Sequence, residues 1–168
     1  FQPAEEGFAG AKAMIEDGLF KKYPIDEIYG MHNMPNLKEG VLAVQEGPRL
    51  AAADNFEIEI VGKGAHGAMP SNSIDPIVCG SALVQNLQHI VSRNSNPKET
   101  LVITIASFHS GKANNVIPKN ATLNGTIRYY DDDIGKMVKK RFHEVVNNTC
   151  KAYGAKPIIK FNKGYPAT

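Results

Sequence analysis

The chain has 168 residues, a hydrophobic fraction of 42% and a formal net charge of +2 from 19 basic and 17 acidic side chains. A surface with such balanced charge offers no broad field to attract nucleic acid, and no apolar run approaches the ~20 residues of a membrane-spanning helix. We therefore expect an ordinary globular chain with no nucleic-acid partner and no membrane partner.

The first segment combines two adjacent carboxylates with a short helix pattern. Glu5 and Glu6 follow the residues Phe-Gln-Pro-Ala, and a helix is predicted over residues 11–17, ended by Gly18. Two carboxylates that are buried together need a cation or a shared proton, so one is a candidate metal ligand and the other a candidate base. An acidic first turn, stabilised by the helix dipole, accounts for the pair equally well.

A histidine follows the strand that is predicted over residues 25–31. His32 lies at the end of this strand, beside a glycine and before a proline turn. Strand ends hold side chains more rigidly than free loops do, which makes His32 a candidate ligand. A hydrogen-bonded structural histidine is the commoner role for a lone residue of this kind. Another short strand is predicted over residues 41–45.

A glycine-rich loop over residues 62–70, Gly-Lys-Gly-Ala-His-Gly-Ala-Met-Pro, surrounds His66. It follows an alternating strand pattern over residues 54–62 and precedes a helix that Asp75 caps and Pro76 opens. Loops between strands and helices commonly display binding groups, which makes His66 a candidate functional residue. An incidental solvated histidine in a glycine-rich connection is the alternative.

The rest of the chain predicts a self-contained α+β domain. The later elements are a helix over residues 75–92, strands over 101–109 and 121–130, a helix over 131–152 and a strand over 156–162. With the first strand, the order is β-α-β-β-α-β, the ferredoxin-like arrangement, and we expect the two middle strands to pair. Cys79 and Cys150 lack metal-ligand spacing and are expected to be buried thiols in a reducing compartment.

Five short motifs together resemble the ordered motif set of one enzyme family. They are Phe-Gln-Pro-Ala-Glu-Glu, Gly-Met-His-Asn-Met-Pro, the loop around His66, Asn-Val-Ile-Pro from Asn115, and Gly-Thr-Ile-Arg ending at Arg128. In this order the chain is similar to the dinuclear metallopeptidase family that contains aminoacylases, hippurate hydrolases and auxin-amino-acid-conjugate amidohydrolases. The resemblance covers essentially the whole chain.

The resemblance implies that the first segment contributes to a metal centre. Glu5 matches the general base that takes a proton from a metal-bound water, and Glu6 and His32 match metal ligands. The physical chemistry agrees, because a divalent cation lowers the pKa of bound water towards neutrality and a neighbouring carboxylate accepts the proton.

The resemblance also implies that the later motifs contact the substrate. His66 matches a lid histidine that polarises the scissile carbonyl, commonly in the active site of the partner subunit. Asn115 matches a residue that helps to hold the substrate. Arg128 matches one that contacts a substrate carboxylate or the subunit interface. A donor placed opposite the metals stabilises the oxyanion of the tetrahedral intermediate.

The implied organisation has three parts. Residues 1–52 form a partial α/β metal-binding catalytic domain, residues 53–164 a ferredoxin-like lid and dimerisation domain, and residues 165–168 a return to the catalytic domain. We expect a segment of a longer cytoplasmic protein, because the family's other metal-binding motifs would lie outside it. The intact protein should form a homodimer and hold two divalent ions, Zn or Mn with Co or Ni as further candidates. This segment, with two of the ligands, should hold none stably.

Two functions of different classes fit these observations. The first is a metal-dependent amidohydrolase that cleaves the amide bond of N-acyl amino acids or small peptides. The second is a non-catalytic dimerisation or ligand-binding module, pairing through the strand over residues 156–162 or the helix over 75–92. An RNA-binding sheet is not favoured, because the strand over residues 101–109 offers one aromatic, Phe108.

Overall fold

The computed structural model describes residues 2–4 and 10–168. The chain divides into two compact units, Phe1–Gln45 and Glu46–Thr168. The domain limits predicted at residues 52 and 164 stay predictions. Among the described residues, no helix is both long enough and apolar enough to cross a membrane.

The described part of the first unit contains two short helices, α1 (Gly10–Glu16) and α2 (Leu19–Lys22), which Gly18 separates with a φ of 92°. The strands predicted over residues 25–31 and 41–45 do not form. A strand needs a neighbour to accept and donate its backbone hydrogen bonds, and neither segment pairs with another in the described part of this unit. The prediction of these two strands is therefore wrong, although the α+β class is confirmed.

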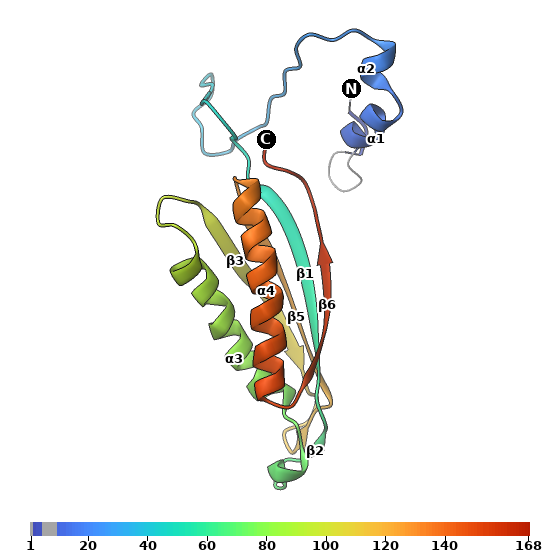
Figure 1. The fold of residues 1–168 in the computed structure, drawn as a ribbon, viewed down its shortest axis with the longest axis vertical. Coiled ribbons are helices and arrows are strands. Elements are labelled where there is room, and N and C mark those ends of the chain that lie inside the picture. Colours follow the sequence, from blue (N-terminus) through green and yellow to red (C-terminus); the bar gives the residue numbers. More distant parts are fainter. Residues whose placement is uncertain (1, 5–9) are drawn as a thin grey trace. The chain divides into compact units, whose positions relative to one another are not determined.

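The second unit is built on a four-stranded antiparallel sheet with the strand order β3-β5-β1-β6 (Figure 1). Its strands are β1 (Ala52–Val61), β3 (Leu101–Ser110), β5 (Asn120–Tyr129) and β6 (Lys156–Asn162). The predicted pairing of the two middle strands is confirmed, since β3 lies against β5 along its whole length. The order β-α-β-β-α-β is the ferredoxin-like one that the sequence predicted.

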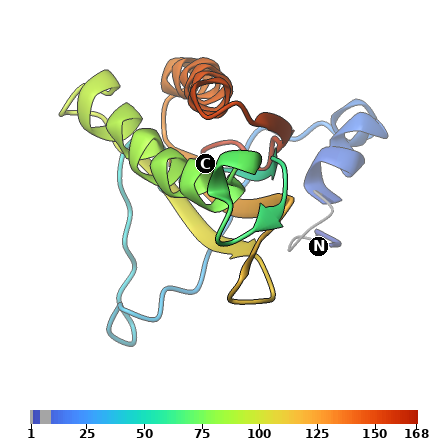
Figure 2. The ribbon, with the colours of Figure 1, turned by 90° about the horizontal axis from the view of Figure 1, so that it is seen from below.

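Both long helices cover the same face of this sheet (Figure 2). They are α3 (Pro76–His89), which continues into the π-helical turn η2 (Ile90–Asn94), and α4 (Asp132–Ala152). Asp75 and Asp131 each accept hydrogen bonds from two of the first backbone N–H groups of their helix, and for Asp75 the sequence predicted this cap.

The core lies between the helices and the sheet. Alternation along β1 turns Phe56, Ile58 and Ile60 towards the helices, while the opposite face carries polar side chains. The Phe56 ring lies 4.7 Å from the Phe142 ring of α4, centroid to centroid. Ile77 is an exception on α3: it is 39% exposed, because it lies in the first turn of the helix.

Candidate functional site

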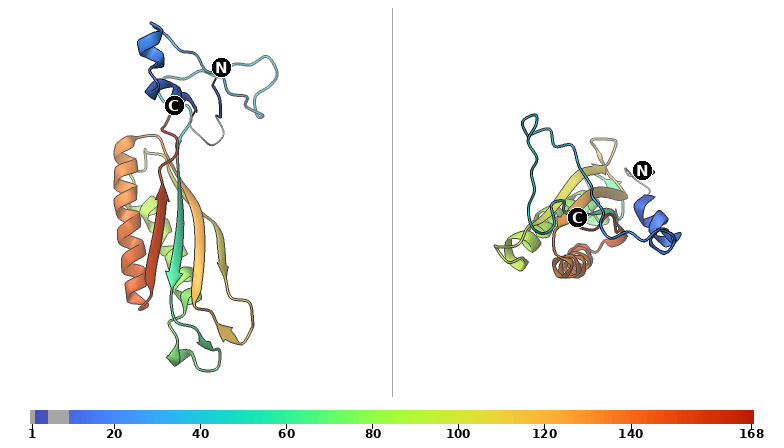
Figure 3. Two further views of the ribbon diagram at one scale, coloured as in Figure 1. Left: turned by 90° about the vertical axis from the view of Figure 1, so that its right-hand side faces the viewer. Right: turned by 90° about the horizontal axis from the view of Figure 1, so that it is seen from above.

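Two loops that are far apart in sequence meet at one end of the four-stranded sheet. β2 (Ala65–His66) pairs with β4 (Val116–Ile117), and this small sheet lies at the foot of the domain in Figure 1 and in the left view of Figure 3. His66 faces Val116 across the pair, and the Gly67 N–H donates a hydrogen bond of 2.8 Å to the Asn115 carbonyl. The structure thus brings together two predicted site residues, His66 and Asn115.

Glycine permits this close approach. A Cβ at Gly67 would lie 3.1 Å from the Asn115 carbonyl oxygen, and one at Gly64 would lie 3.0 Å from the Ile117 oxygen. Both separations are tighter than ordinary van der Waals contact, so a side chain at either position would push the two strands apart. The glycines that make the loop recognisable in the sequence are therefore required by its pairing with β4.

The turn that follows His66 determines which ring nitrogen carries the proton. The Ala68 N–H donates to His66 Nδ1 at 3.1 Å, and the Met69 N–H donates to the His66 carbonyl at 2.8 Å. A backbone N–H can only donate, so Nδ1 is an acceptor and the neutral ring carries its proton on Nε2. The side chain is exposed. This arrangement suits a ring that donates a hydrogen bond from Nε2.

His32 has the opposite tautomer. Its Nδ1 lies 2.8 Å from the Asn33 carbonyl oxygen, which can only accept, so Nδ1 carries the proton and Nε2 has the lone pair. Metal-ligating histidines commonly donate their second ring N–H to a carbonyl in this way, so His32 fits the ligand role. Glu5 and Glu6 lie outside the described residues. Within residues 2–4 and 10–168, no three His, Cys, Asp or Glu side chains gather as a metal site.

Arg128 is not brought to His66 within one chain. It is an exposed residue of β5, opposite Ala53 on β1 and Val102 on β3. β4 leads directly into the start of β5 at Asn120, and eight steps along a strand at about 3.3 Å each place Arg128 about 26 Å further on. Arg128 therefore lies at the end of the domain opposite to His66.

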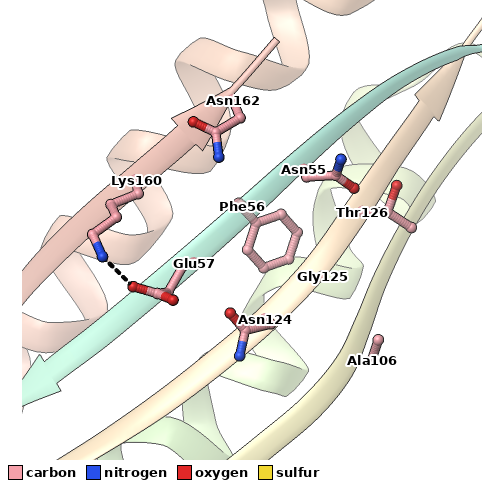
Figure 4. A pocket seen from close by; sticks show the side chains of 9 residues that line it. All are labelled: Asn55, Phe56, Glu57, Ala106, Asn124, Gly125, Thr126, Lys160 and Asn162. Atoms are coloured by element: carbon pink, nitrogen blue, oxygen red, sulfur yellow. Dashed lines mark hydrogen bonds and ion pairs between the residues drawn. The ribbon is translucent and has the colours of Figure 1, made fainter. Parts of the chain in front are cut away.

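The uncovered face of the sheet carries a shallow polar pocket that the sequence analysis did not identify (Figure 4). Its side chains include Asn55, Glu57, Asn124, Thr126, Lys160 and Asn162. Lys160 Nζ pairs with Glu57 Oε1 at 2.7 Å, and this contact raises the pKa of Lys160. The available signal was the polar residues at alternate positions of β1, since alternate residues of a strand share one face of the sheet. Neither His66 nor Asn115 lines this pocket.

The two cysteines are buried in the core rather than placed at a site. Cys79 and Cys150 are free, fully buried thiols on α3 and α4, with their sulfur atoms 3.9 Å apart. Burial raises the pKa of both thiols, and the neighbouring Cys79 helps to raise the pKa of Cys150 to about 12. Both remain protonated at neutral pH and are poor nucleophiles. The predicted burial is confirmed.

The fold and the paired loops define a ferredoxin-like α+β domain with a histidine at its tip. A family model described as a peptidase dimerisation domain, of the M20 family, matches residues 52–154. The chain belongs to this family, and the family resemblance predicted from the motifs is confirmed.

The similar proteins are hydrolases. The chain is 42% identical over 166 residues to N-acetyl-L-cysteine deacetylase of Bacillus subtilis, covering 99% of this chain and 39% of that protein. It is 40% identical over 167 residues to hippurate hydrolase of Campylobacter jejuni, covering 99% of this chain and 43% of that protein. A solved dinuclear metal binding peptidase of the M20 family from Bacillus subtilis matches with a TM-score of 0.76 at 33% identity, covering 100% of this chain and 41% of that one. The chain spans about two fifths of the length of these relatives.

Proposed function

We propose that this chain is the lid and dimerisation segment of a metal-dependent amidohydrolase that cleaves the amide bond of N-acyl amino acids or small peptides. The observation that carries the proposal is the pairing of β2 with β4, which sets His66 beside Asn115. The deacetylase and the hippurate hydrolase that the chain resembles support the substrate class. We also propose a cytoplasmic location, because free buried thiols such as Cys79 and Cys150 are typical of a reducing compartment.

On the lid side, His66 acts as a hydrogen-bond donor rather than as a base. With Nδ1 occupied by the Ala68 N–H, the ring donates from Nε2 to the scissile carbonyl oxygen as negative charge develops there. The exposed Asn115 side chain holds the substrate next to it. Arg128, at the other end of β5, contacts a substrate carboxylate in a site that a second subunit completes, or the subunit interface itself.

On the catalytic side, the first segment holds part of the metal centre. Glu6 and His32 would bind two divalent ions, zinc or manganese with cobalt or nickel as alternatives, together with ligands from outside this chain. When bound, the ions supply a water molecule of lowered pKa and a Lewis acid. Glu5 takes the proton from the attacking water and returns it to the leaving amine.

The test uses the full-length protein that contains this segment, assayed with added Zn²⁺ or Mn²⁺ on N-acyl amino acids. Glu5→Gln should abolish most of the turnover, because a carboxamide cannot accept the proton. Glu16→Gln is the matched control, since Glu16 is an exposed helical residue. Full turnover by the Glu5 variant would show the mechanism to be wrong.

A second function is favoured by the description of the matching family as a dimerisation domain. In this alternative the chain associates without taking part in chemistry, through the edge strand β6 or through α3. Light scattering of the chain at high concentration separates the two cases, together with the effect of His66 on the rate. Dimers combined with a turnover that is indifferent to His66 would support the association module alone.

A further inference from the structure

One carboxylate is buried at the opposite end of the domain from His66. Asp54 is 4% exposed and occupies an inward-facing position of β1. Its Oδ2 accepts a hydrogen bond of 3.0 Å from the Tyr129 hydroxyl, and its Oδ1 accepts one of 3.0 Å from the Gly164 N–H. No ion pair found among the described residues includes it. A buried carboxylate is costly without such bonds, so its position calls for an explanation.

A change of register at the end of β6 explains the bond to Gly164. The regular pairing of β6 with β1 ends where Asn162 faces Asn55. Two residues earlier on β1, the Ala53 N–H donates to the Tyr165 carbonyl, three residues beyond Asn162. The chain that leaves β6 therefore contains one extra residue, as at a β-bulge. The Gly164 N–H falls at this irregularity, and the Asp54 side chain accepts its hydrogen bond.

The two segments stay together beyond this point. A Cβ at Gly164 would lie 1.8 Å from the Ala53 carbonyl oxygen, so the backbones touch here. Further along, the Leu50 N–H donates to the Thr168 carbonyl at 2.6 Å, and the Thr168 N–H donates back to Leu50 at 3.0 Å. The chain leading into β1 and the chain leaving β6 run side by side (Figures 1 and 3). We call residues 50–54 and 163–168 the connector.

We propose that Asp54 is a positioning residue that fastens the two strands of the connector to each other, so that both connections of the domain move as one paired hinge. The inference rests on the proposed function, in which the connector joins the lid to a catalytic domain. A single paired hinge allows fewer orientations of the histidine tip than two independent linkers would. Asp54 thereby limits where His66 can be delivered, without contacting the substrate.

The first experiment is amide hydrogen exchange on the 168-residue chain without substrate. In the natural sequence, the Gly164 amide should exchange slowly although no backbone carbonyl of residues 2–4 and 10–168 accepts it. Asp54→Ala should speed its exchange by about tenfold or more, as expected for loss of a hydrogen bond to a charged group. Asp54→Asn should restore protection, because the carboxamide oxygen can accept the same bond.

Tyr129→Phe is the matched control. It removes the partner of Oδ2 and leaves the acceptor of Gly164 in place, so the Gly164 amide should stay protected. Rapid exchange of the Gly164 amide in the natural sequence would overturn the proposal. That measurement needs no variant and stands even where Asp54→Ala does not fold.

The second experiment measures hydrolysis by the full-length protein. Asp54→Ala should lower kcat by about tenfold, matching the loosened hydrogen bond, with little change in KM, and Asp54→Asn should recover most of the rate. If Asp54→Ala speeds Gly164 exchange but leaves kcat unchanged, the hydrogen bond of Asp54 is only a local structural contact. That result would overturn the positioning role. A full-length protein with no hydrolytic activity would refute the proposed function, while the exchange data would still decide whether the connector is clamped.

Discussion

The tip, which is the β2–β4 pair around His66, and the connector lie at opposite ends of one sheet. Their polar side chains differ in burial and in hydrogen bonding. At the tip, His66 is exposed, and a single backbone N–H from its own turn orients the ring. At the connector, Asp54 is buried, and both of its oxygens are bonded to other parts of the domain. A group that must meet an external partner keeps a donor available to solvent, whereas a group that holds the fold together has its hydrogen-bonding capacity used internally. The comparison therefore assigns chemistry to the tip and orientation to the connector.

The largest expected effect is on catalysis at the tip. His66→Ala in the full-length protein removes the donor and should lower kcat by about 10²- to 10³-fold, the usual cost of one oxyanion donor. The exposed ring contributes little packing, so urea unfolding should show almost unchanged stability. His109→Ala is the control, since His109 is also exposed but lies on β3. A His66 variant that loses stability and keeps its kcat would show that His66 supports the fold and takes no part in the chemistry.

The next effect is a pH dependence of stability at the connector. Burial, assisted by the hydrogen bond to Asp54, raises the pKa of Tyr129 from 10.0 to about 12. The folded state therefore favours the neutral phenol, so this contribution is complete below pH 10 and is lost as the pH rises towards 12. Two pKa units correspond to about 3 kcal/mol of unfolding free energy.

Urea unfolding at pH 9 and at pH 11.5 measures about 2 kcal/mol of this loss, because the rest is lost only at still higher pH. Cys150, whose raised pKa is also about 12, changes stability in the same direction, so the comparison must be with Tyr129→Phe. The Phe variant should show a clearly smaller loss between the two pH values. If both proteins lost the same unfolding free energy between the two pH values, the pH dependence would come from a group other than Tyr129.

Two glycine substitutions, one at each end of the domain, should lower the free energy of unfolding by different amounts. Gly164→Ala places a Cβ 1.8 Å from a backbone oxygen and should cost about 2 kcal/mol or more of unfolding free energy. Gly67→Ala meets a backbone oxygen at 3.1 Å and should cost less than about 1 kcal/mol. The tip variant should instead lower kcat by displacing His66 from Asn115. Thermal melts and kinetics on both variants check the contrast.

The smallest effect concerns the core that joins the two ends. Cys79 and Cys150 should react with a thiol reagent only as fast as the domain unfolds, because both are buried and protonated. Serine substitution of either cysteine should leave the kcat that depends on His66 and the Gly164 amide exchange of the connector unchanged. Rapid labelling of the native chain would indicate that the helices separate from the sheet more readily than their packing suggests.

Local sequence signals predicted most of the second unit. The strand over residues 156–162 was predicted at its observed limits, and Asp75 caps its helix as expected. The predicted strands over residues 25–31 and 41–45 do not form, because neither has a neighbouring strand in the described part of the unit. Asp54 was treated as the start of a strand, although a carboxylate at an inward-facing position was a usable sign of a buried polar contact.

The amino-acid sequence alone determined the alternation, the caps and the family motifs, because these depend on neighbours within a few residues. It also identified His66 and Asn115 as candidates through their motifs. Only the tertiary structure decided that β2 and β4 pair, that Arg128 lies at the far end of β5, and that Asp54 bonds to Gly164 across the connector. Each of these depends on which strands become neighbours and in what register. Register is a property of the packed sheet, and no single segment carries it.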